Sequence, residues 1–117
     1  MIERIFQLSE SIRYVAVYKN GHLESRSKSN TLAVSSAESD RYEELLVNPT
    51  LLKLASQRGN IDCGGLEYVL VRYGNFFQFV TPTSWGHLSV CIEADVDPIQ
   101  VGAAVMSLVN KSSRESK

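Results

Sequence analysis

Residues 66–94 read LEYVLVRYGNFFQFVTPTSWGHLSVCIEA and contain three strand-like runs with only short turns between them. The runs cover residues 66–73, 76–80 and 86–94, and each is rich in β-branched or aromatic residues. Gly, Asn, Pro and Thr bound the runs, which is typical of strands joined by turns. The stretch therefore predicts a three-stranded antiparallel meander that needs a layer of helix to cover it.

Two further strands are predicted before the meander. Residues 14–18, YVAVY, are apolar on both faces, as is typical of a strand in the middle of a sheet. Asn20-Gly21 is a strong hairpin signal because both residues tolerate positive φ. The returning run from His22 to Lys28 carries charged or polar side chains along one face, which indicates a solvated edge strand.

A helix is predicted near each end of the chain. Residues 2–12 place apolar side chains at helical spacing. Asp97 followed by Pro98 is the pattern of an N-cap and a first helical residue, and no charged residue follows until Lys111. Because a helix this apolar cannot lie on an open surface, we expect it to pack on the sheet and to need a second neighbour.

The middle of the chain is predicted to be helical but interrupted. Ser35 and Glu38 have the spacing of a capping box, which begins a helix after a polar loop. Proline fits the first turn of a helix better than its interior, so Asn48-Pro49 should divide the region into two helices, the second capped by Asn48. We expect Gly59 to end the second helix. The apolar stripe of these helices consists of Tyr42, Leu45, Leu46, Leu51, Leu52, Leu54 and Ala55.

The predicted order is (α)-β-β-α-β-β-β-α, an α+β fold in which helices pack on one antiparallel sheet. A chain of 117 residues is long enough for one core and too short for two ordinary domains. We therefore expect a single domain over residues 1–110 and a polar C-terminal tail over residues 111–117.

The composition is that of an ordinary globular protein, with 44% apolar residues, 21% charged residues and a net charge of −1. Nucleic-acid binding is not expected, because it relies on clustered Lys and Arg. No apolar run is long enough to predict a membrane span, and the first seven residues lack the pattern of a signal peptide. Two cysteines do not make a disulfide scaffold, so the expected location is the cytoplasm.

The strand ending in Tyr18-Lys19-Asn20-Gly21, the mid-chain helix, the meander and the apolar helix after Asp97-Pro98 together carry a family resemblance. Over residues 2–110 the chain resembles the roadblock family of dynein light chains and bacterial GTPase regulators, within the longin and profilin-like group. The resemblance implies a five-stranded antiparallel sheet in the order 2-1-5-4-3 with helices on its faces. It also implies a homodimer through the third strand and middle helix, acting as a scaffold or regulator of a small Ras-like GTPase or a larger assembly.

The third strand supports the expected homodimer on its own. It carries apolar residues on both faces, and a free apolar edge would promote aggregation. Pairing with a second copy about a two-fold axis would cover that edge. The expected interface consists of Leu66, Tyr68, Val69, Leu70, Val71 and Tyr73 from the strand and Tyr42, Leu45 and Leu46 from the helix.

No arrangement for catalysis, metal binding or cofactor binding is recognisable in the sequence. Nucleophilic catalysis brings a Ser or Cys together with a base and an acid, but His22 and His87 lie in no such motif. Cys63, Cys91 and the histidines lack the paired spacing of metal ligands, and Cys91 fits a small core residue. The charged helix face over residues 40–44 is expected to be solvated, with steering of a basic partner as the alternative.

An aromatic cluster, Phe76, Phe77, Phe79 and Trp85, supplies the candidates for contact with a partner. Strand alternation sends Phe77 and Phe79 to one face of the sheet and Phe76 to the other. Either helices cover both faces, or part of the cluster is an exposed binding surface. The expected function is a non-enzymatic protein-interaction module. The alternative is a PAS-like sensor that holds a small ligand between the sheet and the middle helices.

Overall fold

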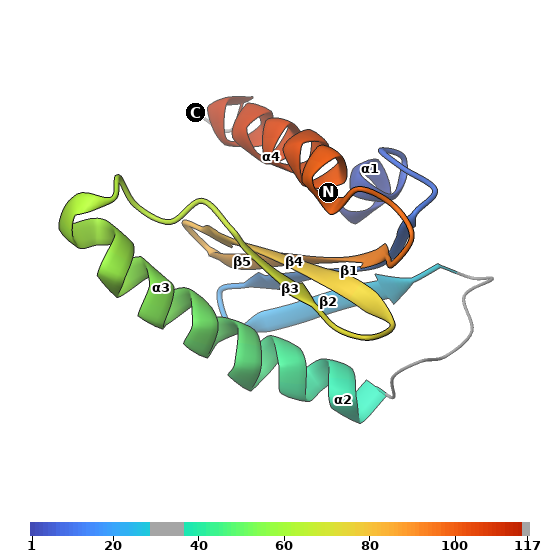
Figure 1. Cartoon of the computed structure of the whole chain (residues 1–117), viewed down its shortest axis with the longest axis horizontal. Coiled ribbons are helices and arrows are strands. Elements are labelled where there is room, and N and C mark those ends of the chain that lie inside the picture. The colour runs from blue at the N-terminus through green and yellow to red at the C-terminus, as the bar shows by residue number, and fades with distance from the viewer. Residues whose placement is uncertain (29–36, 116–117) are drawn as a thin grey trace.

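The computed structural model describes residues 1–28 and 37–115, which form one sheet with helices on both faces. The elements follow in the order α1 (Ile2–Phe6), β1 (Ile12–Lys19), β2 (His22–Ser27), α2 (Ala37–Tyr42), the π-helical segment η1 (Glu43–Val47), α3 (Asn48–Asp62), β3 (Val69–Arg72), β4 (Phe76–Thr83), β5 (Gly86–Glu93) and α4 (Pro98–Glu115). Figure 1 shows α1 and α4 on one side of the sheet and the run from α2 to α3 on the other. The expected capping box at Ser35 lies outside the described residues.

The sheet has the order β2-β1-β5-β4-β3, and all neighbouring strands are antiparallel. The α+β fold and the order 2-1-5-4-3 are therefore confirmed. The hairpin at Asn20-Gly21 also forms as predicted, with φ values of 52° and 87°. The first helix is shorter than expected, because Ile12 already belongs to β1 and is buried in the core.

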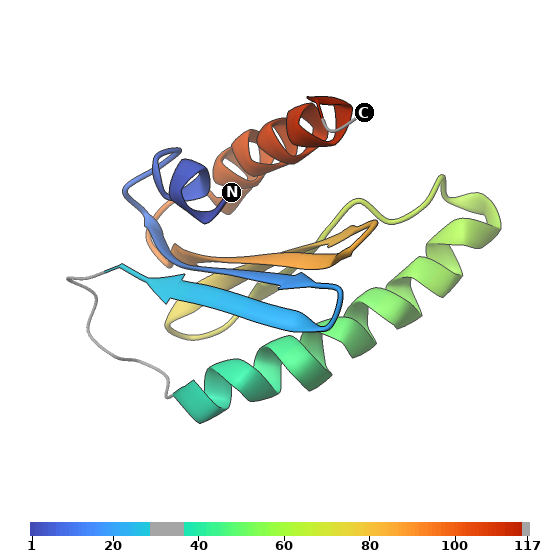
Figure 2. The same cartoon turned by 180° about the vertical axis from the view of Figure 1, so that it is seen from behind.

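The larger hydrophobic core lies between the sheet and the pair α1 and α4, which Figure 2 shows side by side. α4 begins as predicted: the Asp97 carboxylate accepts a hydrogen bond from the Ile99 N–H at 2.9 Å, and Pro98 is the first helical residue. The helix continues to Glu115, so most of the expected polar tail is helical. The buried members of this core are Ile2, Ile5, Ile12, Val15, Phe79, Leu88, Val90, Ile92 and Val105.

Gly102 lets α4 approach the sheet closely. A Cβ at this position would lie 2.8 Å from Cε2 of the fully buried Phe79. We expect Gly102→Ala to lower the free energy of unfolding by about 1–3 kcal/mol, because the helix must shift away from the ring. Urea unfolding measures this, with Gly74→Ala as the control, since a Cβ at Gly74 meets nothing within 4 Å. Equal midpoints for the two variants would contradict the close approach.

The middle helical region is continuous and is not divided at Asn48-Pro49. Asn48 has helical φ and ψ of −63° and −46°, so its expected role as a cap is wrong. A proline ring clashes with the carbonyl four residues earlier, here that of Leu45. The wider π turn relieves this crowding, and in it the Asn48 N–H donates to the carbonyl of Glu43. The π segment therefore allows one continuous helix to contain Pro49 in its interior.

The helix also continues past Gly59, which was expected to end it. Gly59 is needed for a close approach instead, since a Cβ there would lie 3.3 Å from the carbonyl carbon of Gly65. The chain leaves the helix after Asp62, where the N–H groups of Cys63 and Gly65 donate to the carbonyl of Gly59 at 3.0 and 3.1 Å. Gly64 and Gly65 have φ of 82° and 91°, which turns the chain back toward β3.

Candidate interaction surface and buried polar site

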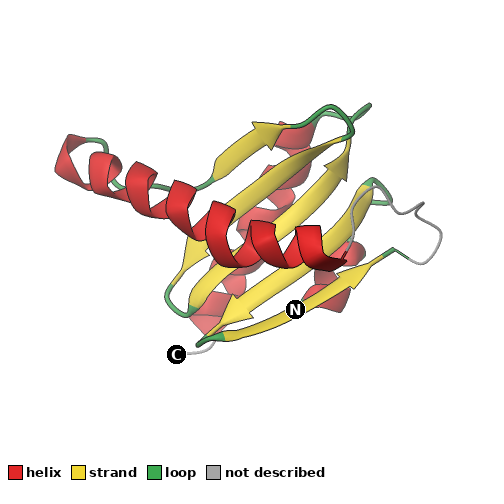
Figure 3. Ribbon diagram, turned by 90° about the horizontal axis from the view of Figure 1, so that it is seen from below, coloured by secondary structure: helices red, strands yellow, loops and turns green. Residues whose placement is uncertain are grey.

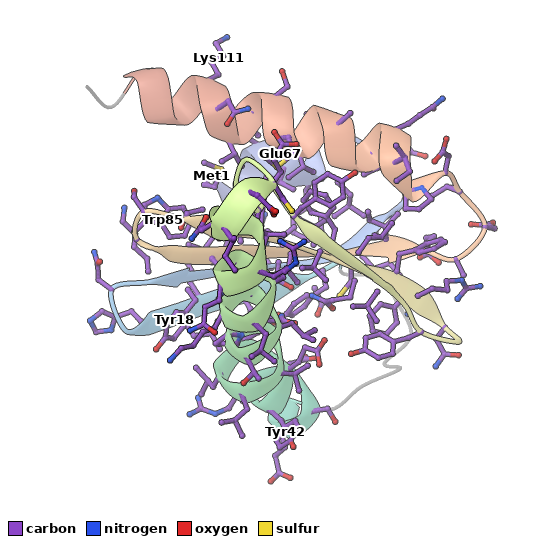
Figure 4. All side chains as sticks on the ribbon, turned by 60° about the vertical axis from the view of Figure 1, so that its left-hand side comes forward. Met1, Tyr18, Tyr42, Glu67, Trp85 and Lys111 are labelled. Carbon is purple, nitrogen blue, oxygen red and sulfur yellow. The ribbon has the colours of Figure 1, made fainter. Side chains whose placement is uncertain are left out.

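The helical run from α2 to α3 crosses the sheet obliquely (Figure 3) and turns much of its apolar stripe to solvent. Figure 4 shows Tyr42 pointing away from the sheet at one end of this run. An extended exposed apolar surface of this kind usually marks an interaction site. Its exposed members, with their exposed fractions, are Tyr42 (61%), Leu45 (37%), Leu46 (56%), Leu54 (62%) and Ile61 (75%).

The β3 strand forms one edge of the sheet and pairs only with β4 among the described strands. Its residues Val69, Leu70 and Val71 are half-buried. The Tyr73 hydroxyl, just beyond β3, donates to the Glu43 carboxylate at 3.0 Å. Because Glu43 belongs to η1, this bond joins the end of the strand to the part of the helix that carries Leu45 and Leu46.

The residues expected at the dimer interface differ in how far they are exposed to solvent. Tyr68 and Leu70 pack against the larger core, and the ring centroids of Tyr68 and Phe79 are 4.8 Å apart. Leu66 is half-buried, whereas Tyr42 and Leu46 are exposed. The helix therefore offers more accessible apolar surface than the strand does.

The aromatic candidates for partner contact fall into two groups. Phe79 is fully buried beneath α4, so its prediction as a partner-binding residue is wrong. Phe76, Phe77 and Trp85 are half-buried, on a sheet that helices cover on both faces. Each of these three rings lies beneath a cationic side chain from another strand, at 4.9–5.9 Å from the ring centroid.

A buried polar group lies between the helix and the sheet. The Glu44 side chain is 1% exposed, and its Oε1 lies 2.9 Å from Nε2 of the buried His87. The Asn48 amide donates to the same oxygen at 2.8 Å. Glu44 Oε2 and Asn48 Oδ1 are buried with no hydrogen-bond partner among the described residues. The expectation that the whole 40–44 face is solvated is therefore wrong for Glu44.

Sequence reasoning missed this group although a signal was present. Glu44 and Asn48 are four residues apart, so they share one side of a helix. On β5, His87, Ser89 and Cys91 alternate with apolar residues, which places polar side chains on one face. The two patterns together indicate a polar layer between this helix and the sheet.

The polar layer continues along the sheet through Gln78, Ser89 and Cys91. The Gln78 amide donates to the Ser89 hydroxyl, and the Cys91 thiol donates to Gln78 Oε1 at 3.0 Å. Burial, followed by the nearby Glu44 carboxylate, raises the pKa of the Cys91 thiol well above its usual value. A thiol held protonated in this way is a poor nucleophile, in keeping with its expected role in the core. Cys63 is exposed.

A cavity of about 650 Å³ opens between α2–η1 and the sheet. Burial raises the pKa of the Glu43 carboxyl, with a further contribution from the Glu44 charge, while the Tyr73 hydrogen bond opposes the rise. Burial and the same hydrogen bond raise the pKa of Tyr73 to about 12. The cavity is lined by Tyr14, Glu38, Ser39, Asp40, Tyr42, Glu43, Glu44, Val47, Tyr73, Phe76, Gln78 and Cys91.

Over 1–28 and 37–115, no group of three or more His, Cys, Asp and Glu residues is arranged to hold a metal ion. Within these ranges, none of the helices combines the length and apolar character needed to cross a membrane.

Comparison with solved structures, unlike comparison with sequences, finds similarity to this chain. No protein-family model matches the chain, and neither does any curated protein sequence. Among solved structures, the chain is similar to the crystal structure of MglC from Myxococcus xanthus, with a TM-score of 0.57 and 15% sequence identity. The match covers 98% of this chain and 94% of that one. At this identity the likeness bears on the fold alone, and together with the sheet order it shows that the chain has a roadblock-like fold.

Proposed function

We propose that the protein is a non-enzymatic interaction module that forms a homodimer and docks a protein partner. The single observation that carries this proposal is the exposed apolar row on the α2–α3 helix, Tyr42, Leu45, Leu46, Leu54 and Ile61. The helix turns Glu44 and Asn48, together with Leu52, toward its own sheet and these apolar residues outward. Such a row is costly in water unless another surface covers it.

A second copy is the occupant that the fold favours for this row. The Tyr73–Glu43 hydrogen bond holds the free β3 edge and the apolar row together at one corner of the molecule. A two-fold axis at that corner would pair β3 with its own copy and pack the two helices together. The same contact would cover an apolar edge strand, which otherwise promotes aggregation.

Leu46→Asp is expected to weaken the homodimer at least about a hundredfold, because it places a charge in the centre of the apolar contact. Light scattering after size-exclusion chromatography measures the change, with the native chain dimeric at micromolar concentration. Ser107→Asp is the control, since it adds the same charge at an exposed position of α4 on the opposite layer. A native chain that is monomeric at micromolar concentration would contradict the proposed dimer.

The proposed partner is a small Ras-like GTPase or a larger assembly that contains one. The family resemblance of the sequence supports this class of partner, and the roadblock-like fold agrees with it. The native dimer, used as bait in a native lysate, should retain a small GTP-binding protein in one nucleotide state more strongly than in the other. Recovery of no GTP-binding protein in either state would contradict this part of the proposal.

A further inference from the structure

The cavity between α2–η1 and the sheet has properties that docking of a protein on the outer helix face does not use. Its volume of about 650 Å³ is that of a small-ligand site. It lies on the inner side of the helix, whereas Leu46 and Leu54 lie on the outer side. Tyr42, at 61% exposed, stands where the cavity meets solvent.

The lining of this cavity is negatively charged. Glu38, Asp40, Glu43 and Glu44 contribute carboxyl groups, and no Lys or Arg belongs to the described lining. Arg13 stacks over Phe76 at 5.7 Å, but its guanidinium binds the carbonyl of Asn75 and the Glu93 carboxylate. The His87 ring, which also stacks on Tyr18, makes its polar contact in the described residues with Oε1 of Glu44. Burial is the main cause of the raised pKa of Glu43, and the neighbouring carboxylates of Glu44 and Asp40 add to it.

Glu44 supplies a second and independent indication of a ligand. Its side chain is 1% exposed, it lines the cavity, and its Oε2 has no hydrogen-bond partner in the described part of the chain. A buried carboxylate oxygen without a donor is strongly unfavourable. The hydroxyl of Tyr14, also in the lining, is buried and makes no hydrogen bond of good geometry within residues 1–28 and 37–115, where Ser25 interacts with it. A ligand that brings N–H donors would satisfy Glu44 Oε2.

The remaining lining fits the body of a cation. The lining presents the aromatic rings of Tyr42, Tyr73 and Phe76. The ring centroids of Tyr73 and Phe76 are 5.4 Å apart, and their ring planes form an angle of 54°. Aromatic faces attract ammonium and guanidinium groups. The carboxylates are not grouped as metal ligands among the described residues, so a molecule with both a charged head and an apolar body suits the site better than a bare ion.

We propose that this cavity binds an organic cation, an ammonium or guanidinium group on a short apolar body, with Glu44 and Glu43 as the acceptors of its N–H groups. The head enters between these carboxylates and the body lies against the rings of Tyr73 and Phe76. An anion would be repelled by the same lining, and a neutral ligand would leave the charge of Glu44 uncompensated. The proposal does not require the dimer, although Tyr42, Glu43 and Tyr73 belong both to the cavity and to the corner where the dimer is proposed.

The test is titration of the full-length chain with butylguanidinium and benzylammonium, followed by amide chemical shifts. Both cations are expected to bind at millimolar concentration or below and to shift amides around residues 42–47 and 73–78. Butanol and benzyl alcohol, which share the bodies without the charge, are expected to bind at least about tenfold more weakly. The cation could be a free small molecule or the side chain of an arginine in a polypeptide. An acetylated and amidated Gly-Arg-Gly peptide distinguishes the two, because it binds only if the cavity admits an arginine side chain from a polypeptide.

Glu44→Gln and Glu43→Gln are expected to weaken both cations at least about tenfold. The amide of Glu44→Gln can still accept from His87 and Asn48, and thermal unfolding checks that the variant is folded. Glu67→Gln is the matched control, since it removes the same charge from an exposed residue outside the cavity. Equal binding of cations and alcohols, unchanged binding in both cavity variants, or no binding of either cation would overturn the proposal. Light scattering on the same samples reports the dimer separately, so failure of one proposal is distinguishable from failure of the other.

Discussion

Gly86→Ala is expected to lower the free energy of unfolding by about 3–5 kcal/mol, or to prevent folding. Gly86 has φ of 152°, in a region that residues with a side chain rarely adopt. A Cβ there would lie 1.9 Å from the carbonyl oxygen of Tyr18, a backbone atom that no change of rotamer can move. Relief of the clash requires β1 and β5 to separate at this point.

The position of Gly86 explains why the effect should spread. Gly86 pairs with Lys19 of β1 and, across the turn that joins β4 to β5, with Thr83. The adjacent Trp85 carbonyl accepts a hydrogen bond from the Asn20 N–H at 2.9 Å, which ties this turn to the first hairpin. Thermal and urea unfolding measure the loss, with Gly74→Ala as the matched control. A similar unfolding midpoint for the two variants would show that the chain relaxes at Gly86 without cost.

The strands could be predicted because their signals are local or repeat with a period of two. Asn20-Gly21 marks the first hairpin, and alternation along β4 places Phe77 and Phe79 on one face. The sheet order came from the family resemblance. Alternation did not predict how far each aromatic side chain of β4 is exposed to solvent. Phe79 lies on the face that α4 covers and is fully buried, so it cannot contact a partner.

The middle helix could not be predicted correctly because its π segment changes the helical phase. Rules for proline place a helix start at Pro49, but the wider turn accommodates the ring in the interior. With the phase changed, a stripe read at 3.6 residues per turn no longer identifies the side that packs on the sheet. Leu46 and Leu54 turn outward, and Glu44 and Asn48 turn inward.

The two candidate sites also differ in how much of them the sequence could predict. The apolar helix residues were predicted as an interface from the family resemblance, and the structure leaves Tyr42 and Leu46 exposed. The cavity depends on which residues of a helix and three strands face one another, and this follows from tertiary packing that no local pattern records. Glu44 was missed because an acidic residue in a charged run is ordinarily solvated, although its spacing from Asn48 and the polar face of β5 indicate a buried polar layer.

His87→Leu is expected to lower the free energy of unfolding by about 3 kcal/mol at neutral pH, because it leaves Glu44 buried with Asn48 as its one described donor. Glu44→Leu is expected to cost a similar amount, since it leaves the His87 ring and the Asn48 amide without their acceptor. Urea unfolding measures both. His22→Leu is the control, because His22 is exposed in the first hairpin and should change stability by less than about 0.5 kcal/mol.

The double variant Glu44→Leu with His87→Leu separates stability from function. It removes both partners and replaces them with apolar side chains, so its loss should be smaller than the sum of the single losses by about 1.5–3 kcal/mol. Additive losses would show that the two side chains do not interact across the helix and sheet. A double variant that is stable but no longer binds butylguanidinium would show that the buried pair is kept for its charge. In that case the outer row of Leu46 and Leu54 would remain able to form the dimer, because the substitutions lie on the opposite side of the helix.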